Sequence, residues 1–173
     1  MSEQQLAVVT GGSRGIGRAI AVELASHGYE VVITYKANDE AAAETLRLIR
    51  EGGGSGEVLK FDVGNADETE VKLGELLARR ERIDVLVNNA GVTADGLFMM
   101  MPREDWNTVI HTTLGGFYNM TKPILRKMVR KKRGSIVSLS SVSALVGNRG
   151  QANYAAAKSG IIAASRAGFI NRF

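Results

Sequence analysis

LAVVTGGSRGIGRAIAVEL, residues 6–24, contains the segment that decides the fold. A short apolar run leads into the glycine-rich turn TGGSRGIG, residues 10–17, and apolar residues then recur at helical spacing. A dinucleotide pyrophosphate binds to this order of strand, glycine turn and helix, because glycines allow close backbone approach and the helix N-terminus supplies N–H donors. The spacing Gly11-x-x-x-Gly15-x-Gly17 differs from G-x-G-x-x-G, so a plain turn between strand and helix is the alternative.

The remainder of the chain alternates between strand and helix patterns. We predict further strands at 30–35, 58–63, 83–87 and 136–140, and further helices at 39–50, 66–80, 104–130 and from residue 152 onward. The glycine-rich segment 52–56 is interpreted as a helix cap and flexible link. This alternation predicts an α/β fold of Rossmann type, a doubly wound parallel sheet in three layers.

Composition excludes several classes of protein. The 173 residues are 45% hydrophobic and 23% charged, which predicts one domain over residues 1–173 that buries about 70% of its unfolded surface. With no cysteine and two histidines, we expect no disulfide, no metal site and a reducing, cytoplasmic location. The polar start MSEQQ predicts no signal peptide, and no apolar run approaches the ~20 residues that span a membrane. The net charge of +4 argues against a nucleic-acid partner.

Polar residues follow the carboxyl ends of the predicted strands. A parallel sheet of this type binds its ligand at these ends. Arg14 lies in the glycine turn, and Lys36, Asp62 and Asn89 fall at the carboxyl ends of later strands. NAD-binding folds usually place an acid at the end of the second strand, where this chain has Tyr35 and Lys36. Two cations, Arg14 and Lys36, suit a 2′-phosphate, so we predict NADPH as the cofactor. Either cation alone is also typical of a solvated surface.

A candidate catalytic group lies in SVSALVGNRGQANYAAAK, residues 141–158. Tyr154 and Lys158 are four residues apart in an alanine-rich run, so on a helix they are neighbours on one face. An ammonium about 5 Å away, at an effective dielectric of roughly 20, favours a phenolate by about 3 kcal/mol. Ser141, across a glycine-containing loop, can hydrogen-bond the same substrate oxygen. The alternative is an ordinary amphipathic surface pair.

Three further features have a structural and a functional interpretation. The helix at 104–130 carries an apolar stripe typical of core or subunit interface, and the histidines at 27 and 111 are interpreted as structural. FMMM, residues 98–101, is interpreted as an apolar lining near a substrate mouth, with core packing as an equal alternative. A basic cluster ends the long helix and consists of Arg126, Lys127, Arg130, Lys131, Lys132 and Arg133. The cluster either complements the helix dipole or docks an acidic carrier partner.

Taken together, TGGSRGIG, Asp62-Val63, NNAG, Ser141 and Tyr154-x-x-x-Lys158 resemble the short-chain dehydrogenase/reductase family, from residue 6 to about 167. RGSIVSLSSVS and GNRGQANYAAAKSG are similar to the bacterial 3-oxoacyl-[acyl-carrier-protein] reductases and their relatives in polyketide and polyene pathways. The resemblance implies NADPH-dependent reduction of a 3-oxoacyl thioester on acyl carrier protein. It also implies a homo-oligomer, either a dimer or a tetramer.

The same resemblance implies roles for individual residues. Tyr154 would be the proton donor, Ser141 would hold the substrate carbonyl, and Lys158 would lower the tyrosine's pKa and hold the nicotinamide ribose. The implied cofactor-binding set is Gly11, Ser13, Arg14, Gly15, Ile16, Gly17, Lys36, Asp62, Val63, Asn89, Ala90 and Gly91, with Tyr154 and Lys158. The implied carrier dock consists of Arg126, Arg130, Lys132 and Arg133.

Two departures from the family pattern leave alternatives open. Thr113, in VIHTTL, stands where the family usually has an asparagine that supports a water chain to the catalytic lysine. The chain ends at Phe173, before the family's later strands and substrate lid, and AGFI at 167–170 resembles a turn that normally follows the sixth strand. We therefore expect residues to be absent near Ala167. The alternatives are a reductase of another ketone or secondary alcohol, and a shortened non-catalytic nucleotide-binding protein.

Overall fold

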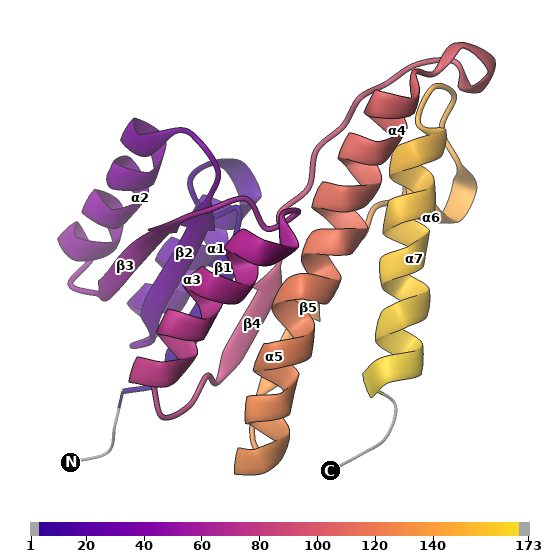
Figure 1. Ribbon diagram of the computed structural model, residues 1–173. Helices are drawn as coiled ribbons and strands as arrows, with labels where there is room; N and C mark the ends of the chain where they lie inside the picture. Colours follow the sequence, from indigo (N-terminus) through magenta and orange to yellow (C-terminus); the bar gives the residue numbers. More distant parts are fainter. Residues whose placement is uncertain (1–3, 170–173) are drawn as a thin grey trace.

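Five parallel strands form a sheet in the computed structural model, which describes residues 4–169 (Figure 1). The strands are β1 (Leu6–Thr10), β2 (Glu30–Tyr35), β3 (Ser55–Lys60), β4 (Val85–Asn88) and β5 (Ser135–Ser138). Their order is β3-β2-β1-β4-β5, and every adjacent pair is parallel. The chain winds outward from β1 to β3 and then returns to β4, so the predicted doubly wound parallel sheet is confirmed.

Helices cover both faces of this sheet. α1 (Gly15–Ser26) and α2 (Asp39–Glu51) pack on one face, and α3 (Ala66–Arg79) and α5 (Gly116–Lys131) pack on the other. Successive residues of β1 point to opposite faces: Ala7 and Val9 join the first core, and Leu6 and Val8 join the second. The strand is buried on both sides, which explains its unbroken apolar sequence. Within residues 4–169, no helix is both long and apolar enough to cross a membrane.

The glycine-rich segment before β3 differs from the prediction. β3 begins at Ser55, inside the segment 52–56 that was expected to be a flexible link. Gly56 pairs with Val31 of β2, and a Cβ on Gly56 would stand 2.4 Å from the Val31 carbonyl oxygen. The glycine therefore permits a close approach of two strands. The prediction of a strand over 58–63 is wrong at both ends, and Asp62 follows the strand.

The long helix expected over 104–130 is three consecutive helical segments that form one column in Figure 1. They are α4 (Arg103–Val109), the π-helical segment η2 (Ile110–Gly115) and α5. A Cβ on Gly116 would stand 2.7 Å from Cγ2 of Val63, so the column packs closely against the segment after β3. π-helical turns are frequent at functional sites, and Thr113 lies in this one.

The last part of the described chain also departs from the sequence-based expectation. β5 ends at Ser138, and the loop after it contains a short helix, α6 (Ser143–Val146), that was not predicted. α7 (Ala152–Phe169) begins where it was expected and includes the AGF of AGFI. The interpretation of AGFI as a turn is therefore wrong for its first three residues, because they are helical. Ile170 lies outside the described residues.

Two helical glycines have opposite surroundings. A Cβ on Gly17 of α1 would stand 2.3 Å from the Gly11 carbonyl oxygen and 2.5 Å from Nδ2 of Asn89. A Cβ on Gly74 of α3 would have no heavy atom within 4 Å. Gly17 is therefore required by packing, whereas Gly74 only lowers the helix propensity of α3.

We expect Gly74→Ala to raise the free energy of unfolding by about 1 kcal/mol and Gly17→Ala to lower it by about 1–3 kcal/mol through overpacking. The two substitutions add the same methyl group, so each controls for the other. Urea unfolding followed by circular dichroism measures both. Changes of the same sign would contradict the packing described for these two positions.

Candidate active site

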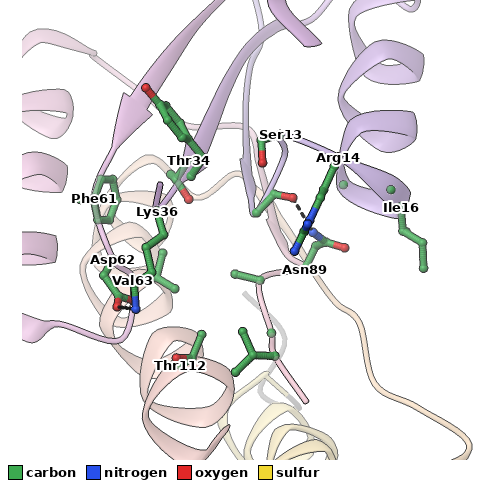
Figure 2. A pocket seen from close by; sticks show the side chains of 17 residues that line it. Ser13, Arg14, Ile16, Thr34, Lys36, Phe61, Asp62, Val63, Asn89 and Thr112 are labelled. Carbon is green, nitrogen blue, oxygen red and sulfur yellow. Dashed lines mark hydrogen bonds and ion pairs between the residues drawn. The ribbon is translucent and has the colours of Figure 1, made fainter. Parts of the chain in front are cut away.

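A cavity of about 360 Å³ opens at the carboxyl ends of β1, β2 and β4 (Figure 2). Its lining includes the whole predicted nucleotide set of the glycine turn and strand ends: Gly11, Ser13, Arg14, Gly15, Ile16, Gly17, Lys36, Asp62, Val63, Asn89, Ala90 and Gly91. The N-terminal turn of α1 also borders the cavity, so backbone N–H donors and the positive end of the helix dipole are available to an anion. These residues fit a dinucleotide phosphate.

Two residues that sequence reasoning missed hold the glycine turn in place. Thr10 Oγ1 accepts hydrogen bonds from the backbone N–H groups of Asn89 at 3.0 Å and Ala90 at 2.9 Å. The guanidinium of Arg18 donates to the Ser13 carbonyl oxygen at 2.7 Å and so ties the turn to its own helix. The only sequence signal for either residue is its place in or beside the glycine motif. The contacts of Thr10 join segments that meet only in the fold, whereas the contact of Arg18 with Ser13 is local to the motif.

The two cations predicted for a 2′-phosphate both border this cavity, but their surroundings differ. Lys36 Nζ lies 2.6 Å from Oδ2 of Asp62, whose Oδ1 accepts a hydrogen bond from the Gly64 N–H at 2.8 Å. Figure 2 shows this pair on one side of the cavity and Arg14 on the other. The Arg14 side chain is exposed and makes no ion pair within residues 4–169. Arg14 is thus the cation available to a ligand without breaking a contact.

Tyr154 and Lys158 border a second cavity, of about 350 Å³. Arg14, Asn89 and Gly91 line this cavity as well as the first one, and Val92 also lines both. The two cavities are therefore adjacent, and their shared wall consists of the glycine turn and the segment after β4. This arrangement brings the predicted tyrosine and lysine beside the predicted nucleotide site.

Lys158 is buried, with 4% of its surface exposed. Its Nζ donates a hydrogen bond to the Leu139 carbonyl oxygen at 2.7 Å and lies 5.8 Å from the centroid of the Tyr154 ring. Burial lowers the pKa of the Lys158 ammonium below its ordinary value. The amine is thus held near the phenol in an environment that eases loss of its proton.

Thr113 lies beside the same amine. Its side chain is 1% exposed, and its Oγ1 has no hydrogen-bond partner within residues 4–169. Thr113 Oγ1 and Lys158 Nζ stand 3.4 Å and 3.6 Å from the position of a Cβ on Gly91. A buried hydroxyl without a partner calls for an explanation, and a water molecule between these groups would supply the missing hydrogen bond.

Ser141 lines neither of the two cavities. Its Oγ accepts a hydrogen bond from the Ser143 N–H at 3.2 Å. The residues around it tie the loop to α7: Ser140 Oγ donates to the Lys158 carbonyl oxygen at 3.0 Å, and Ser143 Oγ contacts Gln151 Oε1 at 3.0 Å. Ser141 therefore lies along the stretch of α7 that contains the tyrosine, with its hydroxyl engaged locally.

The basic cluster lies away from both cavities. Lys132 ends α5, and Arg133 Nε lies 3.3 Å from Oδ1 of the buried Asp84, just before β4. Arg126, Arg130 and Lys132 make no ion pair within residues 4–169. Strands β4 and β5 both begin at this edge, so the predicted carrier dock is at the opposite edge of the sheet from Tyr154.

Comparisons with known proteins agree with this geometry. The family model described as short chain dehydrogenase matches residues 5–168. The chain is 44% identical over 158 residues to a 3-oxoacyl-[acyl-carrier-protein] reductase of Synechocystis sp., covering 91% of this chain and 64% of that protein. It is 42% identical over 162 residues to the 3-oxoacyl-[acyl-carrier-protein] reductase FabG of Staphylococcus aureus, covering 94% of this chain and 66% of that protein. The chain thus spans just under two thirds of these relatives' lengths.

A similar solved structure is the crystal structure of a metagenomic short-chain oxidoreductase in complex with NADP. It superposes with a TM-score of 0.90 at 35% sequence identity. The match covers 94% of this chain and 74% of that chain. The fold similarity therefore includes the sheet and the helices that border both cavities.

The lowered pKa of Lys158 predicts a pH-dependent stability. Between the folded pKa and the unfolded value near 10.4, the unfolded chain binds more protons, so the stability of the native protein rises with pH. The free energy of unfolding of the wild type, relative to that of Lys158→Met, should rise between neutral and alkaline pH. We expect a rise of about 1.4 kcal/mol for each unit by which the pKa of Lys158 is lowered. Urea unfolding at pH 7 and at a series of values up to about pH 11, above the unfolded pKa, measures this.

Lys72→Met is the control, because Lys72 lies on the exposed surface of α3. A wild-type minus Lys158→Met difference that stays constant with pH, or falls as pH rises, would contradict the effect of burial on this amine.

Proposed function

This chain belongs to the short chain dehydrogenase family, and we propose that it reduces the ketone of a 3-oxoacyl thioester to a secondary alcohol with NADPH. One observation carries the proposal: the cavity of Tyr154 and Lys158 shares Arg14, Asn89 and Gly91 with the nucleotide cavity. A ketone held near the tyrosine would therefore lie next to the end of a nucleotide bound along the glycine turn. Such adjacency is what a hydride transfer requires.

NADPH, when bound, supplies the hydride that reduces the carbonyl carbon. Tyr154 donates a proton to the carbonyl oxygen, and Lys158, 5.8 Å from the phenol ring centroid, stabilises the charge that this leaves on the phenol. Thr113 holds a water molecule beside Lys158, so that the proton can be replaced from solvent. Ser141 donates its O–H to the carbonyl oxygen, which it can do while its Oγ accepts from the Ser143 N–H.

The substrate class is supported by the names of the relatives, both of which are 3-oxoacyl-[acyl-carrier-protein] reductases. The proposed substrate is accordingly a 3-oxoacyl chain carried on acyl carrier protein. The dock at Arg126, Arg130, Lys132 and Arg133 stays a prediction, as does the homo-oligomer. α5 extends over Gly116–Lys131, about 24 Å at 1.5 Å per residue. A carrier at the end of α5 would therefore lie at the opposite edge of the sheet from Tyr154.

For the tyrosine, we expect Tyr154→Phe to reduce kcat by about 10²- to 10⁴-fold, the usual contribution of a positioned proton donor. The assay follows NADPH absorbance with an acetoacetyl thioester. Tyr118→Phe is the matched control, since Tyr118 is 56% exposed on α5 and its hydroxyl contacts only Lys122 among the described residues. Equal turnover by Tyr154→Phe and wild type would refute the proton-donor role.

Absence of turnover in all three proteins would favour one of two alternatives. The first alternative is that the substrate is a ketone other than a 3-oxoacyl thioester, and the same assay with other ketones tests it. If NADPH binds and no ketone is reduced, a non-catalytic nucleotide-binding protein is the better description.

NADPH as the cofactor is supported by Arg14 and Lys36, which both border the nucleotide cavity, and by the NADP bound to the similar short-chain oxidoreductase. To contact a 2′-phosphate, Lys36 Nζ has to leave or share its contact with Asp62. The exposed Lys36 can do so at low cost, because exposed ion pairs contribute about 0–1 kcal/mol. Arg14 needs no such rearrangement.

We expect Lys36→Met to weaken NADPH binding by about 10- to 100-fold, since a charge-assisted hydrogen bond contributes about 1.5–3 kcal/mol, and to leave NADH binding nearly unchanged. Lys60→Met is the control: Lys60 pairs with Asp39 at 2.8 Å but does not line the nucleotide cavity. Titration of each dinucleotide by fluorescence measures both affinities. An equal loss for NADPH and NADH would remove Lys36 from the 2′-phosphate site.

A further inference from the structure

An exposed apolar surface lies at the 3₁₀ helix η1 (Phe98–Met100). Phe98 is 71% exposed, Met99 90% and Met100 73%, so the core-packing interpretation of FMMM is wrong. The Phe98 ring contacts the Trp106 ring edge-on, with centroids 6.1 Å apart. Contiguous apolar side chains left in water usually mark a binding surface.

A cavity of about 490 Å³ adjoins this surface and is lined by Phe98, Met101, Arg103 and Trp106. Its volume falls within the range of about 300–1,000 Å³ that is usual for small-molecule sites. Three of the four lining side chains are apolar. Methionine is unbranched and flexible, so the cavity and the exposed η1 residues can adapt to chains of different length.

Hydrogen bonds connect the segment just before η1 to the residues that lead into α7 and Tyr154. The Gly96 N–H donates to the Gly150 carbonyl oxygen at 2.8 Å. One residue earlier, Asp95 accepts from Gln151 Nε2 at 3.1 Å. Figure 1 shows the segment between β4 and α4 rising beyond the sheet to end beside the loop between α6 and α7. The segment just before η1 is therefore held beside the residues that precede Tyr154.

The segment that leads to η1 starts at the proposed active site. Val92 and Thr93 line the cavity of Tyr154, and the buried Asn153 donates to the Ala94 carbonyl oxygen at 2.9 Å. Phe98 follows Gly96 by two residues, which places their Cα atoms at most about 7 Å apart. An acyl chain that extends from the tyrosine along this segment thus meets apolar side chains after a short distance.

We propose that Phe98, Met99 and Met100, with the adjoining cavity of Met101 and Trp106, bind the acyl chain of the substrate beyond its ketone. The inference rests on the proposed reductase function and adds a substrate preference to it. An acyl chain that covers this surface removes both its own methylenes and the exposed η1 side chains from water. Each buried methylene favours binding about fourfold, so longer 3-oxoacyl thioesters are the better substrates.

An acyl chain fits this surface better than a second copy of the protein does. The segment that leads to η1 is hydrogen-bonded at residues 94–96 to residues 150–153 around the start of α7, and its residues Val92 and Thr93 line the cavity of Tyr154. The adjoining cavity is also a hollow rather than a flat apolar face. A self-association surface needs neither a connection to the tyrosine nor a hollow.

The test compares kcat/KM for a 3-oxodecanoyl thioester and an acetoacetyl thioester. In the wild type, the ratio should favour the longer acyl chain. In the Phe98→Ser/Met99→Ser variant the ratio should fall by roughly 15-fold, the loss of about two methylene contacts. Val71→Ser is the matched control, since Val71 is 59% exposed on α3, far from η1 in the chain. It should keep the wild-type ratio.

A second measurement detects binding without turnover. Trp106 is the one tryptophan of the sequence and lines the adjoining cavity, so its fluorescence reports on the site. We expect decanoyl-coenzyme A to change its emission and acetyl-coenzyme A not to, with the response reduced in Phe98→Ser/Met99→Ser. Decanoyl binding in a protein that reduces no ketone would retain the acyl surface and remove the reductase proposal.

Two results would overturn the acyl surface itself. One is a chain-length ratio that the Phe98→Ser/Met99→Ser variant leaves unchanged in an active enzyme. The other is a wild-type oligomer, seen by analytical ultracentrifugation, that dissociates in this variant while the ratio and the tryptophan response persist. The latter would assign η1 to an interface between copies of the chain.

Discussion

The side-chain amide of Asn89 is the contact on which the two cavities depend. Its Nδ2 donates to the Thr10 carbonyl oxygen at 2.8 Å and to the Gly11 carbonyl oxygen at 3.1 Å. The amide thus joins the ends of β1 and β4, the neighbouring strands between which the winding of the sheet reverses. Gly17 has no room for a Cβ because this same amide and the Gly11 carbonyl occupy the space. The glycine turn, the start of α1 and the segment after β4 are therefore one rigid unit.

A second set of polar contacts positions α7 against this unit. Asn153, which is fully buried, holds the segment after β4, and Ser140 holds the backbone at Lys158. Lys158 itself reaches the Leu139 carbonyl oxygen at the end of β5. Because α7 is tied on both sides, Tyr154 faces a cavity whose other wall is the glycine turn. Burial of Lys158 is a consequence of this arrangement, and it also lowers the pKa of the amine.

Local patterns were sufficient to predict the sheet and to place several polar residues at the carboxyl ends of its strands. The full nucleotide set came from the family resemblance and stays a prediction. Strands predicted from apolar runs alternate with helices predicted from residue spacing, and this alternation implies a parallel sheet. Parallel strands bring Arg14, Lys36 and Asn89 to one edge of that sheet. The predicted element bounds were wrong where a residue's tertiary contacts, and not its preference for helix or strand, decide the local structure. Gly56 was assigned to a link because the glycines of 52–56 follow a predicted helix, but it permits the close pairing of β3 with β2. The π-helical turn at Thr113 likewise has no apolar signature that distinguishes it from an α-helix.

The amino-acid sequence by itself determined the order of strands and helices, the glycine turn, and the residue types that meet at the carboxyl edge, since these follow from spacing and local backbone preference. Only the tertiary structure decided how charges and polar groups pair across that edge. The contacts of Lys36 with Asp62 and of Arg133 with Asp84 each join segments distant in sequence. The Thr113 hydroxyl, which has no hydrogen-bond partner within residues 4–169, lies near Lys158 of a distant helix. Such contacts depend on distances of a few ångströms, which a one-dimensional pattern does not contain.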